Sequence, residues 1–317
     1  MEILMQDFID IDDAIIVSLD EYVDSISDSS YRGRVLDVFN NVRECLDRLS
    51  RRAGRTVGVP DIRVKLSDKK TAEANPLGSI VLTRGIIDHC LSLKTPAFQE
   101  RPEDPALFAL DPDLAAMLGM AWIVSHEYAH LYRAHHAVEA FLGSEVYVLR
   151  AFEHDADLVA AAAVFRQLQS IVGFLFPDIQ VRQCTLSSIY WIVRTLPDTH
   201  DRTGVHPPFS ERFFQILLKL VTVVTDGSEI YDPDCLRHET QVRRELLIKT
   251  AVACEKAHKG CNDRSSKGYF SEWQDYIERN GHTDIIYDWM KVSPHVERFS
   301  GTIADMSRQN PYRGKIL

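Results

Sequence analysis

The segment His126-Glu127-Tyr128-Ala129-His130 constrains the fold more than any other, because it lies inside a long apolar run without proline. The run extends from Leu114 to Leu142, and its apolar residues recur at helical spacing. On a helix, His126 and His130 lie one turn apart on one face, so both imidazoles can reach one metal ion. Burying these side chains without a partner would be costly. The sequence therefore predicts a core helix with a metal site.

A second acidic segment, Glu153-His154-Asp155-Ala156-Asp157, lies at the start of another predicted helix. Glu153 and Asp157 share one face of that helix at i, i+4. Two histidines and one glutamate form a known ligand set for catalytic zinc, with the fourth position open. Asp157 is placed to accept a ring N–H from a ligand histidine, which fixes the orientation of the ring. We expect one zinc ion (Zn2+) per chain, bound by His126, His130 and Glu153.

A different metal geometry would use His136, which lies ten residues after His126 at the metzincin spacing. That motif needs glycine where this chain has Arg133, because the chain must turn sharply there. Arg133 and the helix-favouring Ala134 predict a continued helix instead. We therefore expect the glutamate-ligand arrangement, with His135 and His136 as surface or packing residues.

Two further blocks stand before and after these segments, in residues 75–88 and 206–212. The first reads as a strand that leads through Thr83-Arg84-Gly85 into a helix, and the second places Arg212 six residues after His206. In this order the four blocks resemble the gluzincin metallopeptidases of the HtpX and CAAX-prenyl-protease type. The resemblance covers roughly residues 55 to 225 and implies that His206 and Arg212 stabilise the oxyanion of the transition state.

The expected fold class is α+β and helix-dominated, with a zincin-like core and a small sheet beside the HExxH helix. We predict three parts: an N-terminal helical segment (1–55), a zincin-like catalytic core (56–225) and a helical C-terminal extension (226–317). Helices are predicted over 9–27, 31–55 and 209–224, and loops over 94–112 and 195–208. One strand could bind an extended peptide by β-addition, or could simply be an edge strand. That predicted substrate strand comprises Gly78, Ser79, Ile80, Val81, Leu82 and Thr83.

Composition indicates a soluble enzyme. The net charge is −10 and no basic run is concentrated anywhere, which argues against nucleic acid as a partner. The longest apolar stretches fall below the ~20 residues that a membrane span needs, so we expect no span.

Six scattered cysteines and the absence of a signal-peptide pattern predict reduced thiols and a cytoplasmic location. Because many relatives of the HtpX type span membranes, we name a second resemblance, to a soluble intracellular relative such as the phage-exclusion protease Lit. The oligomeric state stays open.

The predicted activity is zinc-dependent endopeptidase cleavage of an intracellular protein or peptide substrate. Zinc lowers the pKa of its bound water to about 7 and polarises the scissile carbonyl. Glu127 takes the proton of that water and passes it to the leaving amine.

Two alternatives to this activity remain. The chain could be an interaction protein on a protease-like scaffold, or an HD-type metal phosphohydrolase that uses His154-Asp155 and His200-Asp201. The HD reading leaves Glu127 without a role. Ordinary thiols and a surface histidine are expected rather than a second metal site among Cys235, His238, Cys254, His258 and Cys261.

Overall fold

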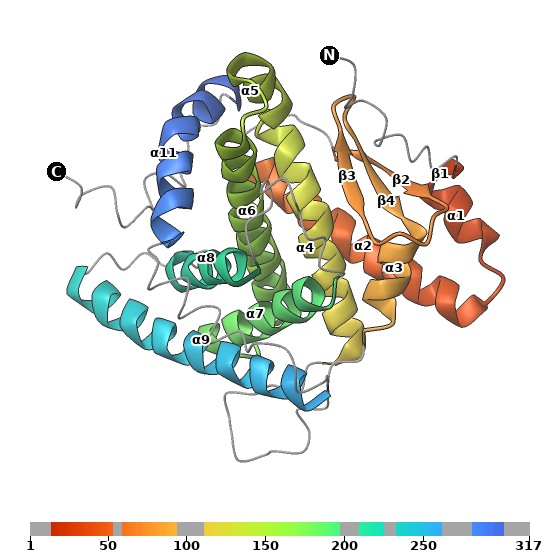
Figure 1. The fold of residues 1–317 in the computed structure, drawn as a ribbon. Coiled ribbons are helices and arrows are strands. Elements are labelled where there is room, and N and C mark those ends of the chain that lie inside the picture. Colours follow the sequence, from red (N-terminus) through yellow and green to blue (C-terminus); the bar gives the residue numbers. More distant parts are fainter. Residues whose placement is uncertain are drawn as a thin grey trace.

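The computed structural model describes residues 14–52, 59–93, 111–196, 209–224, 233–261 and 281–300. Helices dominate these residues, and four strands form one small mixed sheet (Figure 1), so the predicted helix-dominated α+β class is confirmed. The strands are β1 (Ile16–Ser18), β2 (Asp61–Lys65), β3 (Ala72–Asn75) and β4 (Ser79–Thr83). The helices are α1 (Leu19–Ser25), α2 (Ser29–Arg52), α3 (Arg84–Leu91), α4 (Pro112–Tyr132), α5 (His135–Leu142), α6 (Val146–Val172), α7 (Asp178–Thr195), α8 (Phe209–Thr222), α9 (Pro233–Cys261) and α11 (Gly281–Ser300).

Helices α4 and α6 form the centre of the molecule and run antiparallel along each other (Figure 1). Asp111 caps α4 by accepting the backbone N–H groups of Asp113 and Leu114. Both helices bury residues all around their circumference, as expected for helices that are covered on every side. Helix α6 has several buried alanines between Ala156 and Ala163, whose side chains are short. The two backbones can therefore approach closely, which brings the HExxH segment of α4 next to Glu153.

The sheet has the strand order β1-β2-β4-β3. Strand β4 is parallel to β2 and antiparallel to β3, and it is paired along both edges. The predicted substrate strand (residues 78–83) is therefore wrong as a site of β-addition, because an interior strand has no free hydrogen-bonding edge. Strand β3 forms the edge on that side and packs against α4. A three-residue turn joins β3 to β4, and Gly78 adopts the φ of +94° that favours glycine there.

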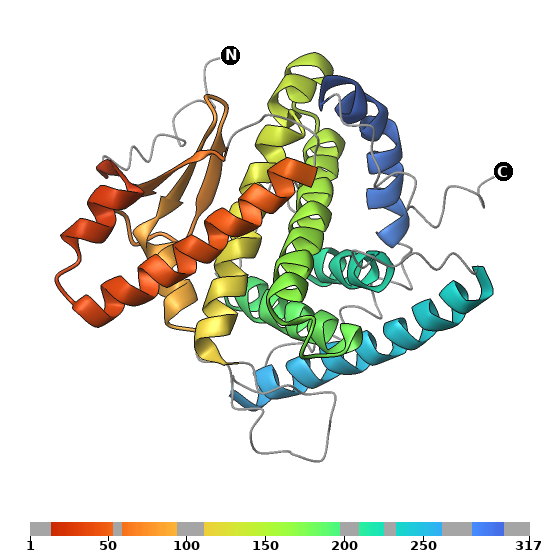
Figure 2. The same ribbon diagram turned by 180° about the vertical axis from the view of Figure 1, so that it is seen from behind.

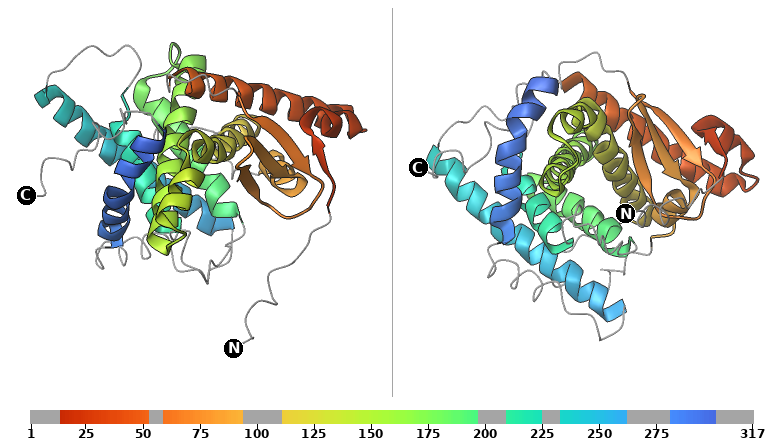
Figure 3. Two further views of the ribbon diagram at one scale, coloured as in Figure 1. Left: turned by 90° about the horizontal axis from the view of Figure 1, so that it is seen from above. Right: turned by 45° about the horizontal axis from the view of Figure 1, so that its top comes forward.

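The remaining helices enclose the central pair. Helix α2 lies across α4 and α6 (Figure 2), while α11 packs along α6 on the side away from the sheet (Figure 3). One continuous apolar cluster includes Leu19, Leu46, Ile123 and Cys254, so residues from all three predicted parts contribute to it. The division into those parts stays a prediction. None of the helices in the described ranges is long and apolar enough to cross a membrane.

The N-terminal helix predicted over 9–27 is confirmed over Leu19–Ser25 and is wrong at Ile16–Ser18. Residues Ile16–Ser18 form strand β1, and a short helix follows because Ser18 caps it in a capping box with Glu21. The second predicted helix is confirmed as α2. The predicted loops at 94–112 and 195–208 lie almost entirely outside the described residues.

Replacing Gly85 by alanine should destabilise the fold, because its Cβ would lie 2.2 Å from the carbonyl oxygen of Asp68. The backbone would have to shift, and we expect a loss of about 1–3 kcal/mol in the free energy of unfolding. Gly33→Ala in α2 is the matched control, since no atom lies within 4 Å of its Cβ position. It should be neutral or stabilising by helix propensity. Urea denaturation of both variants measures the free energy of unfolding. An equal change at the two positions would contradict the packing argument.

Candidate metal and catalytic site

The last turns of α4 and the first half of α6 bring two histidines and a glutamate together. The Nε2 atoms of His126 and His130 lie 3.3 Å apart. Each of them lies 3.5 Å from a carboxylate oxygen of Glu153. The three side chains are between 8% and 14% exposed. The two contacts use different oxygens of Glu153, and one ligand atom from each of the three residues lies within 4.8 Å of the other two, so the described residues contain a ligand triangle of potential metal-binding side chains.

The 3.3 Å between the two Nε2 atoms and the 3.5 Å from each of them to its nearer Glu153 oxygen agree with the spacing around a tetrahedral metal ion. Bonds of about 2.0–2.2 Å at a tetrahedral angle place neighbouring ligand atoms ~3.3–3.5 Å apart. The site also favours positive charge. Burial would lower the pKa of His126, but the carboxylates of Asp157 and Glu153 raise it to about 10. The donor set and its spacing therefore fit a bound cation.

Asp157 lies behind His126 and connects it to helix α8. The Nδ1 atom of His126 is 2.9 Å from a carboxylate oxygen of Asp157. Arg212 donates two hydrogen bonds of 2.8 Å to the same carboxylate. Burial would raise the pKa of Asp157, but Arg212 holds it well below its usual range. Asp157 therefore stays ionised and can orient the His126 ring, as the sequence predicts for it.

The sequence predicted Arg212 as an oxyanion donor but did not predict its contact with Asp157. Two of its N–H groups bind Asp157, and its guanidinium lies 5.8 Å from the Trp122 ring. It nevertheless lines the same cavity as Glu127. Its role as an oxyanion donor stays a prediction. His206, the other predicted donor, lies outside the described residues.

Glu127 faces a cavity of about 140 Å³ that His126, Glu153 and Arg212 also line. Burial of the carboxyl group raises the pKa of Glu127 to about 7. The backbone N–H of Ala74 in strand β3 donates a hydrogen bond to it. A partly buried carboxyl with a pKa near neutrality suits a general base. The edge strand β3 thus orients this side chain.

Helix α4 ends directly after the HExxH segment, so the predicted continuous helix to Leu142 is wrong. Arg133 caps α4, and Ala134 adopts a left-handed conformation with φ of 57°. That conformation costs a residue with a Cβ about 1–2 kcal/mol. Helix α5 then starts at His135. Neither glycine nor proline marks this break, so the sequence carries no ordinary signal for it.

The break places His135 in the interior, so of the two expected roles, surface or packing, it has the packing one, with polar contacts that the sequence did not predict. His135 is 2% exposed and stacks on the Phe152 ring at 4.4 Å. Its Nδ1 atom lies 3.0 Å from Nδ1 of His130, and its Nε2 atom lies 3.1 Å from Asp155. The neighbouring His136 is half-buried and is not part of the ligand triangle.

The other predicted metal residues do not join the site. His154 is buried and faces the Trp289 ring of α11, while His200 and Asp201 lie outside the described residues. On α9, sixteen residues separate His238 from Cys254, which is about 24 Å along a helix. Cys254 contacts Ser187 instead. The five residues considered for a second metal site therefore cannot share one ion.

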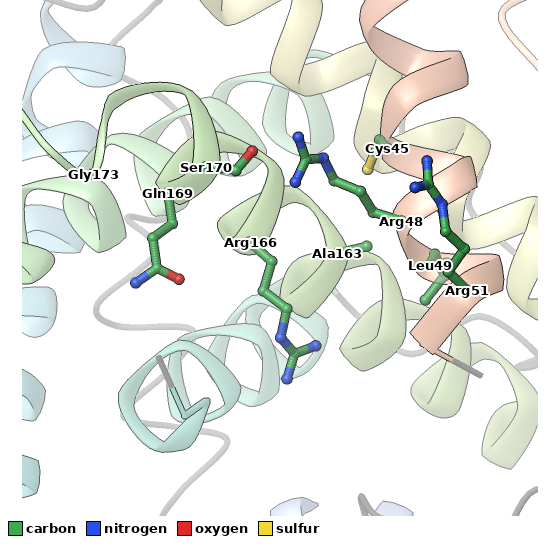
Figure 4. Close-up of a pocket in the computed structure, with 9 residues that line it drawn as sticks. All are labelled: Cys45, Arg48, Leu49, Arg51, Ala163, Arg166, Gln169, Ser170 and Gly173. Carbon is green, nitrogen blue, oxygen red and sulfur yellow. The ribbon is translucent and has the colours of Figure 1, made fainter. Parts of the chain in front are cut away.

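A larger cavity of about 590 Å³ lies between α2 and α6. Arg48, Arg51 and Arg166 line it, and their guanidinium groups point in different directions (Figure 4). It shares no lining residue with the cavity at Glu127. We therefore place the chemistry at the smaller cavity, where the polar groups converge.

Breaking the Asp157–Arg212 pair should destabilise the metal-free protein. Arg212→Met leaves a buried carboxylate without its cation, and we expect a loss of about 3–5 kcal/mol in the free energy of unfolding. Arg43→Met is the control, because its pair with Asp20 is exposed and should be worth at most about 1 kcal/mol. Urea denaturation with a chelator present measures both. Equal losses would show that the buried pair contributes no more to the free energy of unfolding than the exposed pair.

Comparison with known proteins supports a protease-family relative. Residues 95–230 match the family model of Peptidase U49, a family of Lit-like proteases. The matched range contains the ligand triangle, Glu127, Asp157 and Arg212, and it excludes the sheet. It does not support the HtpX and CAAX-prenyl-protease type in particular. No curated protein and no solved structure matches the chain.

Proposed function

We propose that this protein is a zinc-dependent endopeptidase. The observation that carries the proposal is the cavity that Glu127 shares with His126 and Glu153, two members of the cluster of potential ligands. The similarity to Peptidase U49 supports peptide-bond cleavage as the reaction. A structural metal site is closed by four protein ligands and needs no base, whereas within the described ranges this cluster has three potential ligands and a base beside them.

Zinc is the ion that this donor set fits best, since two imidazoles and one carboxylate are a known ligand set of catalytic zinc. Bound there, zinc would polarise a carbonyl and make water more acidic. His126, His130 and Glu153 would hold the ion. Asp157 would fix the His126 ring, and Arg212 would keep Asp157 ionised.

Glu127 would move the proton. Its carboxylate accepts a proton from the attacking water and then delivers it to the nitrogen of the leaving amine. The hydrogen bond from Ala74 holds the carboxylate towards the cavity. Burial places its pKa at about 7, so both proton transfers are feasible near neutral pH.

We place the substrate backbone along strand β3. In the β3–β4 pair, Thr71 is bonded to Thr83 and Asn75 is paired with Ser79, so these alternate residues face β4. Ala72 and Ala74 therefore direct their backbone groups away from β4. The N–H of Ala74 is taken by Glu127, which leaves the backbone groups of Ala72 and the carbonyl of Ala74 facing the edge. An extended peptide could add to this edge and reach Glu127.

Two variants separate metal binding from catalysis. Glu127→Gln should keep about one zinc ion per chain and its fold but lose cleavage, because only the proton carrier is removed. His130→Ala should lose both the zinc and the cleavage. Metal analysis and the appearance of new protein termini in cells that express each form provide the measurements. Undiminished cleavage by Glu127→Gln would refute the mechanism.

The same assays distinguish the alternatives. A zinc-loaded wild-type protein that generates no new termini would favour an interaction protein. Hydrolysis of phosphomonoesters without proteolysis would favour the phosphohydrolase reading.

Ala72→Pro tests the substrate strand. Proline removes an outward N–H group and leaves the pairing with β4 intact, so the fold should tolerate it at an edge. We expect KM for a peptide substrate to rise and the melting temperature to change little. Glu73→Pro is the contrast, because Glu73 pairs with Val81 and its loss should lower stability. An unchanged KM in Ala72→Pro would place the substrate elsewhere.

A further inference from the structure

A second line of buried polar contacts leads away from the ligand triangle through His130. His130 contacts His135 at 3.0 Å between their Nδ1 atoms, and His135 contacts Asp155 at 3.1 Å. Arg133 donates a hydrogen bond of 2.6 Å to the same carboxylate. Arg133, His135 and Asp155 are each no more than 3% exposed. Water therefore cannot replace these contacts easily.

The positions of the protons follow from the atoms that face each other. His130 turns its Nε2 towards Glu153 and His126, so its ring proton lies on Nδ1 when it acts as a ligand. Nδ1 of His135 must then accept the hydrogen bond that the Nδ1–H of His130 donates. Its own proton lies on Nε2 and is donated to Asp155. This arrangement requires a neutral His135 and an ionised Asp155.

The charges of the neighbours agree with this assignment. Arg133 faces the Asp155 carboxylate across 2.6 Å and compensates its charge in the interior. Arg133 is held in turn near the Trp289 ring of α11.

The backbone gives an independent indication that this contact matters. The left-handed Ala134 lies between the end of α4 and His135. L residues disfavour this conformation, and such residues persist where the surrounding structure requires them. The turn is what brings His135 back against the helix that carries His130.

We propose that His135 is a positioning residue, which transmits the orientation imposed by Asp155 and Arg133 to the metal ligand His130. The inference rests on the proposed metal site and extends it. Each ligand histidine then has its own buried carboxylate. His126 contacts Asp157 directly, whereas His130 reaches Asp155 through a second imidazole.

The experiment measures zinc affinity by competition with a chelator, in the full-length protein and without any activity assay. His135→Ala should weaken zinc binding about 10–100-fold, as is typical when a partner of a ligand histidine is lost. His135→Gln should restore part of the affinity, because its amide oxygen can accept the Nδ1–H of His130. His136→Ala is the matched control and should bind zinc like the wild type. Urea denaturation of the metal-free forms identifies any variant that fails to fold.

Two spectroscopic readouts test orientation itself. The visible spectrum of the cobalt-substituted protein should change in His135→Ala and stay unchanged in His136→Ala. Long-range ¹H–¹⁵N spectra of the zinc-loaded wild type should show His135 protonated on Nε2 alone. Wild-type affinity and an unchanged cobalt spectrum in His135→Ala would overturn the inference and leave the proposed function standing. A wild-type protein that binds no zinc would overturn both.

Discussion

Two buried carboxylates on helix α6 hold the site together, and each is neutralised by an arginine from outside α6. Asp157 binds Arg212 of α8 and contacts His126. Asp155 binds Arg133 at the end of α4 and contacts His135. Residues two apart on a helix point about 200° away from each other, so the two carboxylates serve opposite sides of α6. Removing either arginine would leave a buried carboxylate without its cation, and such a change strongly lowers the free energy of unfolding.

These pairs also explain why the site can be rigid. The potential ligands lie on packed helices rather than on loops, and charged groups behind the histidine rings restrain them. The buried alanines of α6 allow the close approach to α4 that the ligand distances require. Strand β3 completes the arrangement from the other side, because Ala74 fixes Glu127. The small sheet therefore contributes to the site as well as to the fold.

Much of this could be predicted from short-range patterns. The spacing of His126, Glu127 and His130 on an apolar helix led to the metal triangle. The i, i+4 pair of Glu153 and Asp157 led to the third member of the cluster and to the contact behind His126. Such patterns succeed because the geometry of one helix is independent of the rest of the chain. The order of strands has no such local signal, and the expectation that residues 79–83 are open to a peptide failed for that reason.

The sequence by itself determined the central helix, the ligand residue types and the helix-dominated class, since periodicity and residue chemistry are local properties. The tertiary structure alone decided that α4 stops at Tyr132 and that Ala134 turns into the left-handed region. It also decided that His135 is buried against His130, and that Arg212 binds Asp157 while it lines the cavity. Each of these depends on charges and rings from segments far apart in the chain. Their contacts exist only once α4, α6, α8 and α11 have packed together.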